Sequence, residues 1–249
     1  MSEFNDHFSD VAQGYAAFRP RYPDALFAAL ASLAPARDVV WDCGCGTGQA
    51  SVALGAHFGQ VHATDASAQQ IALAEPHERV TYRVAPSHAS GLTNGSAALV
   101  TVAQALHWFD VDAFHAEARR VLVSGGVIAE WCYTLLDVPS APLVADVVNA
   151  MDARMRMWWP PQRRHVDSGY DDLAFPFERL DIGAFAMEAE WSARQLAGYV
   201  ATWSAVSRYR AAHGVDPTVE FTRRVTSVWG DVERHTIRWP MVLRVGRVP

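Results

Sequence analysis

Apolar and polar positions form two kinds of segment in the first half of the chain. Short apolar runs rich in Val, Ile and Ala predict buried strands, and the amphipathic runs between them predict helices. The predicted strands are residues 38–43, 60–65, 79–84, 97–103 and 126–132. The predicted helices are residues 4–18, 24–33, 48–57, 67–75 and 110–122, with a turn at 123–126. This alternation predicts an α/β fold with a doubly wound, mostly parallel sheet.

The pattern changes after residue 133. Two alternating segments predict long strands, with a helical region between them. In order, the expected elements are a helix over 143–157, a loop over 158–165, a strand over 178–191, helices over 193–231 and a strand over 236–248. Pro240 predicts a bulge or a strand start, because proline removes a ladder donor. The two strands predict a C-terminal antiparallel hairpin that carries a helical insertion.

The segment 39–48, Val-Val-Trp-Asp-Cys-Gly-Cys-Gly-Thr-Gly, joins the first of the alternating strands to a helix. Glycines let a backbone approach a ligand closely, and the helix start offers free N–H groups to it. A dinucleotide fingerprint counted from Gly44 would need glycine or alanine where Gln49 stands. A second acid, Asp65, ends the next predicted strand, where it can meet ribose hydroxyls.

The spacing Asp-x-Gly-x-Gly-x-Gly from Asp42 to Gly48 resembles motif I of the class I S-adenosylmethionine (SAM)-dependent methyltransferases. Further segments resemble one branch of them, the type 11 or trans-aconitate methyltransferase-like enzymes. These segments are Phe8…Tyr15…Arg19-Pro-Arg-Tyr-Pro23, Ala103-Gln-Ala-Leu-His-Trp-Phe-Asp110, Leu122-Val-Ser-Gly-Gly126 and Arg238-Trp-Pro-Met-Val-Leu-Arg-Val-Gly246. The resemblance implies a seven-stranded Rossmann-like sheet with a C-terminal antiparallel hairpin and helical lid insertions. It also implies SAM as the cofactor and S-adenosylhomocysteine as the product.

The resemblance assigns cofactor-binding roles. Asp42 would face the ammonium of the SAM tail, directly or through water, and Asp65 the ribose. In the family, the loop after the third strand carries an acid that faces the adenine amino group; here His88 stands there, either as a ligand contact or as an ordinary loop histidine. The full implied set is Tyr15, Arg19, Asp42, Gly44, Cys45, Gly46, Gly48, Asp65, Ala66, Ser87, His88, Gln104 and Ala105. For Arg19 the alternatives are a carboxylate partner and a solvated turn.

The segment after Gln104 would face the reacting methyl group. His107 is the best-placed general base if the acceptor is an alcohol or phenol, although a packed histidine is the alternative. Trp108 would lie against the sulfonium, the adenine or the core. The residues expected to contact the substrate are Tyr22, Trp108, Trp158 and Trp159. The basic, Trp-rich stretch from 154 to 165 would suit a flat acidic substrate or form a solvated lid face.

We expect one structural domain. Residues 1–35 would form cofactor-covering helices, 36–133 the SAM-binding core, 134–175 an insertion or lid, and 176–249 the final strand hairpin with its helical insertion at 192–232.

The composition excludes several classes of function and binding site. A net charge of −6 argues against a nucleic-acid surface. All 21 basic residues are arginine, which excludes a Walker A or Schiff-base lysine. Three cysteines form neither a disulfide framework nor a zinc pair, so no metal is expected. With no apolar membrane span and no signal segment, the expected location is the cytoplasm, without membrane or nucleic-acid partners; the oligomeric state is open.

These observations predict a SAM-dependent methyltransferase that acts on a small molecule. O-methylation of an acidic or aromatic metabolite is favoured, at a carboxylate first or at a hydroxyl, because His107 is the single candidate base. One alternative is a SAM-binding protein without turnover. Another is a nicotinamide-dependent oxidoreductase, against which Gln49 and the missing lysine argue.

Overall fold

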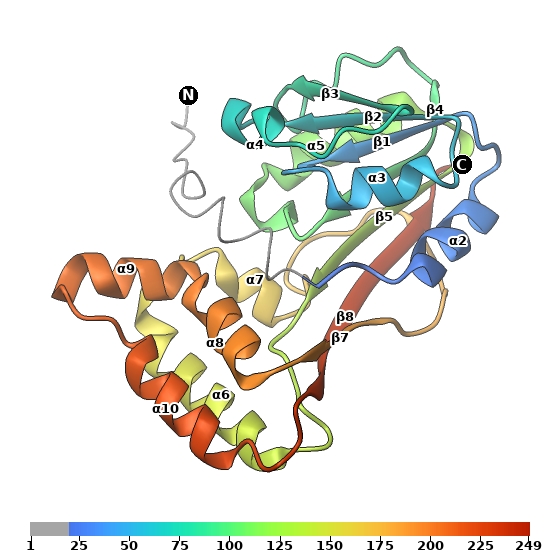
Figure 1. The fold of residues 1–249 in the computed structure, drawn as a ribbon. Helices are drawn as coiled ribbons and strands as arrows, with labels where there is room; N and C mark the ends of the chain where they lie inside the picture. Colours follow the sequence, from blue (N-terminus) through green and yellow to red (C-terminus); the bar gives the residue numbers. More distant parts are fainter. Residues whose placement is uncertain (1–19) are drawn as a thin grey trace.

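The computed structural model describes residues 20–249 and shows an eight-stranded sheet with helices on both faces (Figure 1). The strands are β1 Val39–Cys43, β2 Gln60–Asp65, β3 Val80–Val84, β4 Ala97–Ala103, β5 Leu122–Tyr133, β6 Glu178–Leu180, β7 Ala186–Trp191 and β8 His235–Arg247. Their order is β3-β2-β1-β4-β5-β8-β6, and β7 also pairs with β8. The pairs among β1 to β5 are parallel, whereas β8 is antiparallel to β5, β6 and β7. The predicted α/β fold with a C-terminal antiparallel hairpin is confirmed.

Alternating side chains of the strands supply a core on each face of the sheet. Val40 of β1 joins the cluster that contains α2 (Asp24–Leu33) and α3 (Gln49–Gly55). Trp41, the next residue, joins the opposite cluster, which contains α5 (Val111–Val121). The short helix α4 (Ala68–Ala72) follows β2. Helices on both faces make the sheet doubly wound, as predicted.

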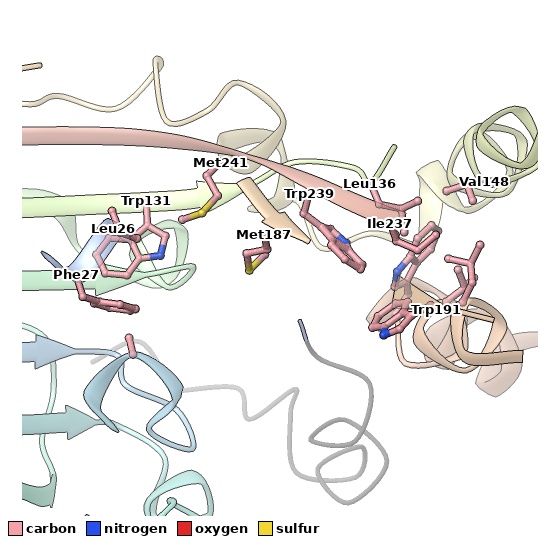
Figure 2. Close-up of a cluster of buried hydrophobic side chains, with 14 of the residues drawn as sticks. Leu26, Phe27, Trp131, Leu136, Val148, Met187, Trp191, Ile237, Trp239 and Met241 are labelled. Atoms are coloured by element: carbon pink, nitrogen blue, oxygen red, sulfur yellow. The ribbon is translucent and has the colours of Figure 1, made fainter. Parts of the chain in front are cut away.

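The helical insertions gather at one end of the sheet (Figure 1). They are α6 Pro142–Met155, the 3₁₀ helix η4 Arg156–Trp158, α7 Arg163–Asp167, α8 Ala193–Ala201, α9 Ser204–His213 and α10 Thr218–Val228. Figure 2 shows Trp131 with Leu26 and Phe27 at one end of a hydrophobic cluster, and Trp191 and Val148 at the other. The helical insertions therefore share a continuous core with the sheet.

The predicted strand over 178–191 is corrected to two strands, which is why the sheet has eight strands and not seven. β6 and β7 are separated by residues 181–185, and both pair with β8. The bulge or strand start expected at Pro240 is also wrong, since β8 runs through it without a break. Pro240 pairs with Ala186, one residue beyond the last β5–β8 pair at Met241. Pro240 has no backbone N–H group, but at this position β8 no longer pairs with β5, so the β5–β8 ladder loses no hydrogen bond.

Three smaller corrections concern turns and helix ends. The expected turn at 123–126 lies within β5, where Gly125 has φ 73° and the register with β4 shifts. The expected loop at 158–165 contains the last residue of η4 and the start of α7. The helix expected at 67–75 is five residues long, and that expected at 4–18 lies outside the described residues. No helix in residues 20–249 has both the length and the apolar character needed to cross a membrane.

Candidate cofactor and acceptor site

The turn after β1 is held by hydrogen bonds to the neighbouring strand. The backbone N–H groups of Gly44 and Cys45 both donate to the carbonyl of Thr64, at 2.8 and 3.0 Å. Gly48 then caps α3 with φ 88°, in the left-handed region that favours glycine. The turn lies at the carboxyl end of the parallel strands, where open α/β sheets bind ligands.

The three glycines of the turn face different surroundings. A Cβ on Gly44 would lie 2.6 Å from the Cβ of Ala105, and one on Gly48 would lie 2.1 Å from the hydroxyl oxygen of Tyr82. Among residues 20–249, a Cβ on Gly46 would meet nothing nearer than the Oε1 atom of Gln70, at 3.7 Å, which is an ordinary contact. Gly44 and Gly48 are thus required by the protein's own packing, whereas none of the described residues crowds Gly46, which leaves room on that side for a ligand.

Asp65 ends β2 beside this space. Its Oδ2 atom accepts the N–H of Gly46 at 2.9 Å, and its Oδ1 atom accepts the N–H of Ser67 at 2.8 Å. The residue is half-buried, and Ala66 next to it is exposed. These two bonds fix the orientation of the Asp65 carboxylate beside the glycine turn.

Asp42 is completely buried below the turn. Ser51 Oγ donates to its Oδ2 atom at 2.5 Å, and Thr101 Oγ1 donates to its Oδ1 atom at 2.9 Å. Burial raises the pKa of Asp42 to about 6; the two hydroxyl bonds oppose this shift and the Asp65 carboxylate adds to it. This burial argues against a direct contact between Asp42 and the SAM ammonium, and the contact through water stays a prediction. Asp42 instead connects β1 to α3 and β4.

The loop after β3 lies next to Asp65, since the N–H of Ala85 donates to the Asp65 carbonyl at 3.0 Å. Ser87 in this loop is half-buried and His88 is exposed. Neither side chain has a hydrogen-bond partner among the described residues. Tyr15 and Arg19 lie outside those residues.

Gln49 is a residue whose contact the sequence did not predict. Its Nε2 atom donates to the carbonyl of Pro20 at 2.8 Å. Gln49, which does not fit the dinucleotide fingerprint, therefore holds the segment before α2 against the start of α3. Its polar side chain at a helix start was a weak signal for this contact.

Gln104 follows β4 with φ 55°, which is unusual for a residue other than glycine. Its N–H donates to the carbonyl of Trp131, and its Oε1 atom accepts the N–H of Tyr133, both at 2.8 Å. Backbone strain of this kind costs about 1–3 kcal/mol and is common at functional sites. Because Ala105 packs on Gly44, the segment after β4 lies against the glycine turn.

His107 belongs to the 3₁₀ helix η3 (Leu106–Trp108). Its Nδ1 atom lies 3.2 Å from the Tyr170 hydroxyl, and its ring centroid lies 4.9 Å from that of Trp108. Burial, with smaller electrostatic contributions from Arg163 and His165, lowers the pKa of His107 to about 3. The ring is neutral at neutral pH and a weak base, which argues against the predicted general base.

The predicted substrate residues separate into two groups. Tyr22 packs edge-on against Trp131 of β5, with ring centroids 5.6 Å apart, and so lies at the end of the sheet near Gln104. Trp158 packs against Tyr209 of α9, at 5.5 Å. The indole N–H of Trp159 donates to Asp152 at 3.1 Å, and the Arg163 guanidinium lies 4.3 Å above its ring. The structure thus brings Tyr22 and Trp108 to the site and packs Trp158 and Trp159 among the helical insertions. In residues 20–249, no three metal-ligating side chains are grouped as a metal site.

Comparison with known proteins agrees with this geometry. A family model described as a methyltransferase domain matches residues 41–129, from β1 to β5. A solved structure from Anaeromyxobacter dehalogenans, provisionally described as a type II methyltransferase, is 44% identical, with a TM-score of 0.87 over 93% of this chain and 99% of that one. A Dictyostelium discoideum protein named provisionally as a methyltransferase is 28% identical over 97% of this chain and 95% of its own length.

A more distant structure, named provisionally as a methyltransferase from Bacillus halodurans, is 18% identical, with a TM-score of 0.50 over 90% of this chain and 98% of that one. It supports the fold alone. The trans-aconitate branch stays a prediction. Since the 44% identical relative is covered almost completely, the chain belongs to the class I SAM-dependent methyltransferases, and SAM is its cofactor.

Proposed function

We propose that this methyltransferase acts on an oxygen atom of a small acidic or aromatic metabolite, and that a carboxylate is its first choice of acceptor. The observation that carries the proposal is the neutral His107, whose pKa is lowered to about 3. A hydroxyl acceptor must lose its proton, which requires a base of matched pKa. A carboxylate is already an anion at neutral pH and requires none.

The described residues suit a bound SAM molecule. They leave room beside Gly46, Asp65 holds its carboxylate beside the glycine turn for the ribose hydroxyls, and the segment from Gln104 packs on the turn. We assign Asp42 an indirect role, in which it holds β1, α3 and β4 together beneath the cofactor. When bound, SAM supplies a methyl group that its sulfonium has already activated.

The acceptor side combines aromatic surface with positive charge. Tyr22 and Trp108, both half-buried, place aromatic rings at the ends of β4 and β5, and the fully buried Trp131 packs behind Tyr22. Arg163 is close enough to His107 to lower its pKa, although Asp167 partly compensates its charge at 2.8 Å. Its positive charge favours an anion near His107. Fixing an acceptor in line with the methyl group and excluding water lowers a barrier by about 7–11 kcal/mol.

The test is a panel of small molecules incubated with the protein and labelled SAM. The panel pairs carboxylic acids with the corresponding alcohols, phenols and amines, and the products are identified by mass spectrometry. We expect methyl esters from some of the acids and slower or no turnover of the matched neutral compounds. Turnover of phenols or amines alone would contradict the choice of a carboxylate. Turnover of macromolecules alone would contradict the choice of a small molecule.

A further inference from the structure

We propose that His107 is a hydrogen-bond donor that binds the acceptor carboxylate through its Nε2–H group, and that Tyr170 is the positioning residue that fixes this tautomer. The identity of the acceptor rests on the proposed function above. The assignment of the ring proton does not, because it follows from the contacts of His107 and Tyr170 alone.

The tautomer follows from the Tyr170 hydroxyl. Tyr170 is completely buried, and among the described residues its hydroxyl has one hydrogen-bond partner, Nδ1 of His107, at 3.2 Å. If Nδ1 carried the proton, the imidazole would donate and the buried phenol proton would have no acceptor. Leaving a buried donor without a partner is costly. The phenol therefore donates to an unprotonated Nδ1, and the neutral ring carries its proton on Nε2.

The second ring nitrogen is free to meet a ligand. Within residues 20–249, Nε2 of His107 has no hydrogen-bond partner. It is also not one of the fully buried side-chain atoms that lack a partner, so the atom remains accessible. It is a donor on the segment that follows Gln104 and packs on the glycine turn through Ala105. A neutral N–H group at this place fits an anionic oxygen.

Tyr170 is itself held in a strained conformation. Its φ of 66° is an outlier for a bulky residue. Among the described residues, Tyr170 and Gln104 are the two non-glycine residues with positive φ, and both lie next to the His107 segment. Strained backbone persists where the surrounding structure fixes it, and such residues cluster at functional sites.

A buried charged cluster fixes the turn that contains Tyr170. The Nη1 atom of Arg244 donates to the carbonyls of Tyr170 and Leu173, at 2.6 and 2.7 Å. The Nη2 atom of Arg244 donates to Glu130 Oε2 at 2.5 Å, and His115 Nε2 lies 2.6 Å from Glu130 Oε1. Glu130 is completely buried, and Arg244 and His115 nearly so. The cluster therefore ties α5, β5 and β8 to the turn that orients His107.

The direct test is the ring tautomer, measured by nitrogen–proton NMR on histidine-labelled protein with S-adenosylhomocysteine bound. We expect His107 to show an unprotonated Nδ1 and a protonated Nε2 from pH 6 to 8. A protonated Nδ1 or a charged ring in this range would overturn the proposal. The variant His107→Gln, which lacks the ring signals, gives the assignment.

A pair of variants separates a donor from a base. In His107→Gln the amide N–H can reach the place of Nε2, whereas in His107→Asn the shorter side chain reaches only that of Nδ1. Removing a hydrogen bond to a charged group lowers the binding affinity by about 10- to 100-fold. With the best acid of the panel, or with benzoate if no acid reacts, we expect the Asn variant to lose about that factor in acceptor binding and the Gln variant less than about 5-fold. Equal losses in both variants would contradict a donor role.

Tyr170→Phe removes the hydroxyl and keeps the ring. We expect a mixture of His107 tautomers and a higher KM for the acceptor, with unchanged affinity for S-adenosylhomocysteine. Tyr209→Phe on α9 is the matched control and should change none of these. If Tyr170→Phe changes only the melting temperature, Tyr170 has no positioning role.

The two proposals can fail separately. A protonated Nε2 without turnover of any carboxylate would contradict the proposed function alone. Carboxylate turnover with a protonated Nδ1 would contradict the donor assignment alone.

Discussion

At the scale of single residues, Asp42 shows how a motif position can have a role that the motif does not specify. Its spacing from the glycines marks it as part of the cofactor turn. The bonds that decide its role come from Ser51 in the next helix and from Thr101, 59 positions away. The sequence shows this acid between a strand and the glycines, but it does not show that the carboxylate is buried.

Replacing Asp42 with Asn tests this placement. The pKa of Asp42 rises from 3.8 to about 6 on folding, so between these values the folded protein keeps a proton that the unfolded chain has released. The free energy of unfolding therefore falls as pH rises through this window, by up to about 3 kcal/mol. Asp42→Asn should be more stable than wild type by about 1–3 kcal/mol above pH 6 and equal to it below pH 4. Urea unfolding at pH 4 and 7.5 measures this, and a variant less stable than wild type at both would contradict it.

His107 illustrates the same limit. The sequence shows that His107 follows Gln104 at the end of a strand, but the low pKa of His107 depends on burial and on Arg163, which is distant in sequence. With a carboxylate acceptor, we expect kcat to change less than about 2-fold between pH 7 and 9, because neither His107 nor the acceptor titrates there. A steep rise over this range, abolished in His107→Gln, would instead indicate a general base.

At the scale of elements, the parallel strands were predicted to within one residue, apart from the start of β5, because their apolar runs are continuous. The interruption between β6 and β7 was not predicted, because residues 178–191 alternate throughout. The break is visible in the pairing, since both strands use β8 as their partner. The alternation of apolar and polar residues indicates which face of the sheet a residue occupies. It does not indicate whether the strand itself is interrupted.

The glycine turn offers a prediction at this scale. Gly48→Ala should destabilise the protein by about 2–4 kcal/mol, because the new Cβ collides with Tyr82 and alanine is strained in the left-handed backbone conformation. Gly46→Ala carries the strain alone and should cost about 1–2 kcal/mol. Gly46→Ala should nevertheless weaken S-adenosylhomocysteine binding about 10-fold or more, as measured by calorimetry. Unchanged affinity in Gly46→Ala would show that the cofactor does not use the room beside Gly46.

At the scale of the whole molecule, the buried cluster of Arg244, Glu130 and His115 joins three elements. Arg244→Met leaves the Glu130 carboxylate without its guanidinium, and removal of one partner of a buried pair costs about 3–5 kcal/mol. Adding Glu130→Gln removes the uncompensated charge. The loss of unfolding free energy in the double variant should therefore be smaller than the sum of the losses in the two single variants. Denaturant unfolding of the three variants measures the coupling, and additive losses would contradict it.

Cofactor binding should also stabilise the whole chain. S-adenosylhomocysteine at about 100 times its Kd contributes about 2.7 kcal/mol, which raises the melting temperature by about 5–10 °C for a chain of this size. NAD should leave it unchanged, because Gln49 stands where a dinucleotide turn needs glycine or alanine. A rise with NAD and none with S-adenosylhomocysteine would contradict the cofactor assignment.

The pairing of β7 with β8 has a consequence for how such a protein can change over time. Trp191, the last residue of β7, pairs with His235, the first residue of β8, so the two ends of segment 192–234 are cross-strand neighbours. A segment whose ends meet can be exchanged for another of different length without altering the path of the strands. Segment 192–234 is then a replaceable cassette, provided that its substitute covers the apolar face of α6. The cofactor turn at 42–48 and the His107 segment lie outside the cassette, so both can be inherited unchanged when it is exchanged.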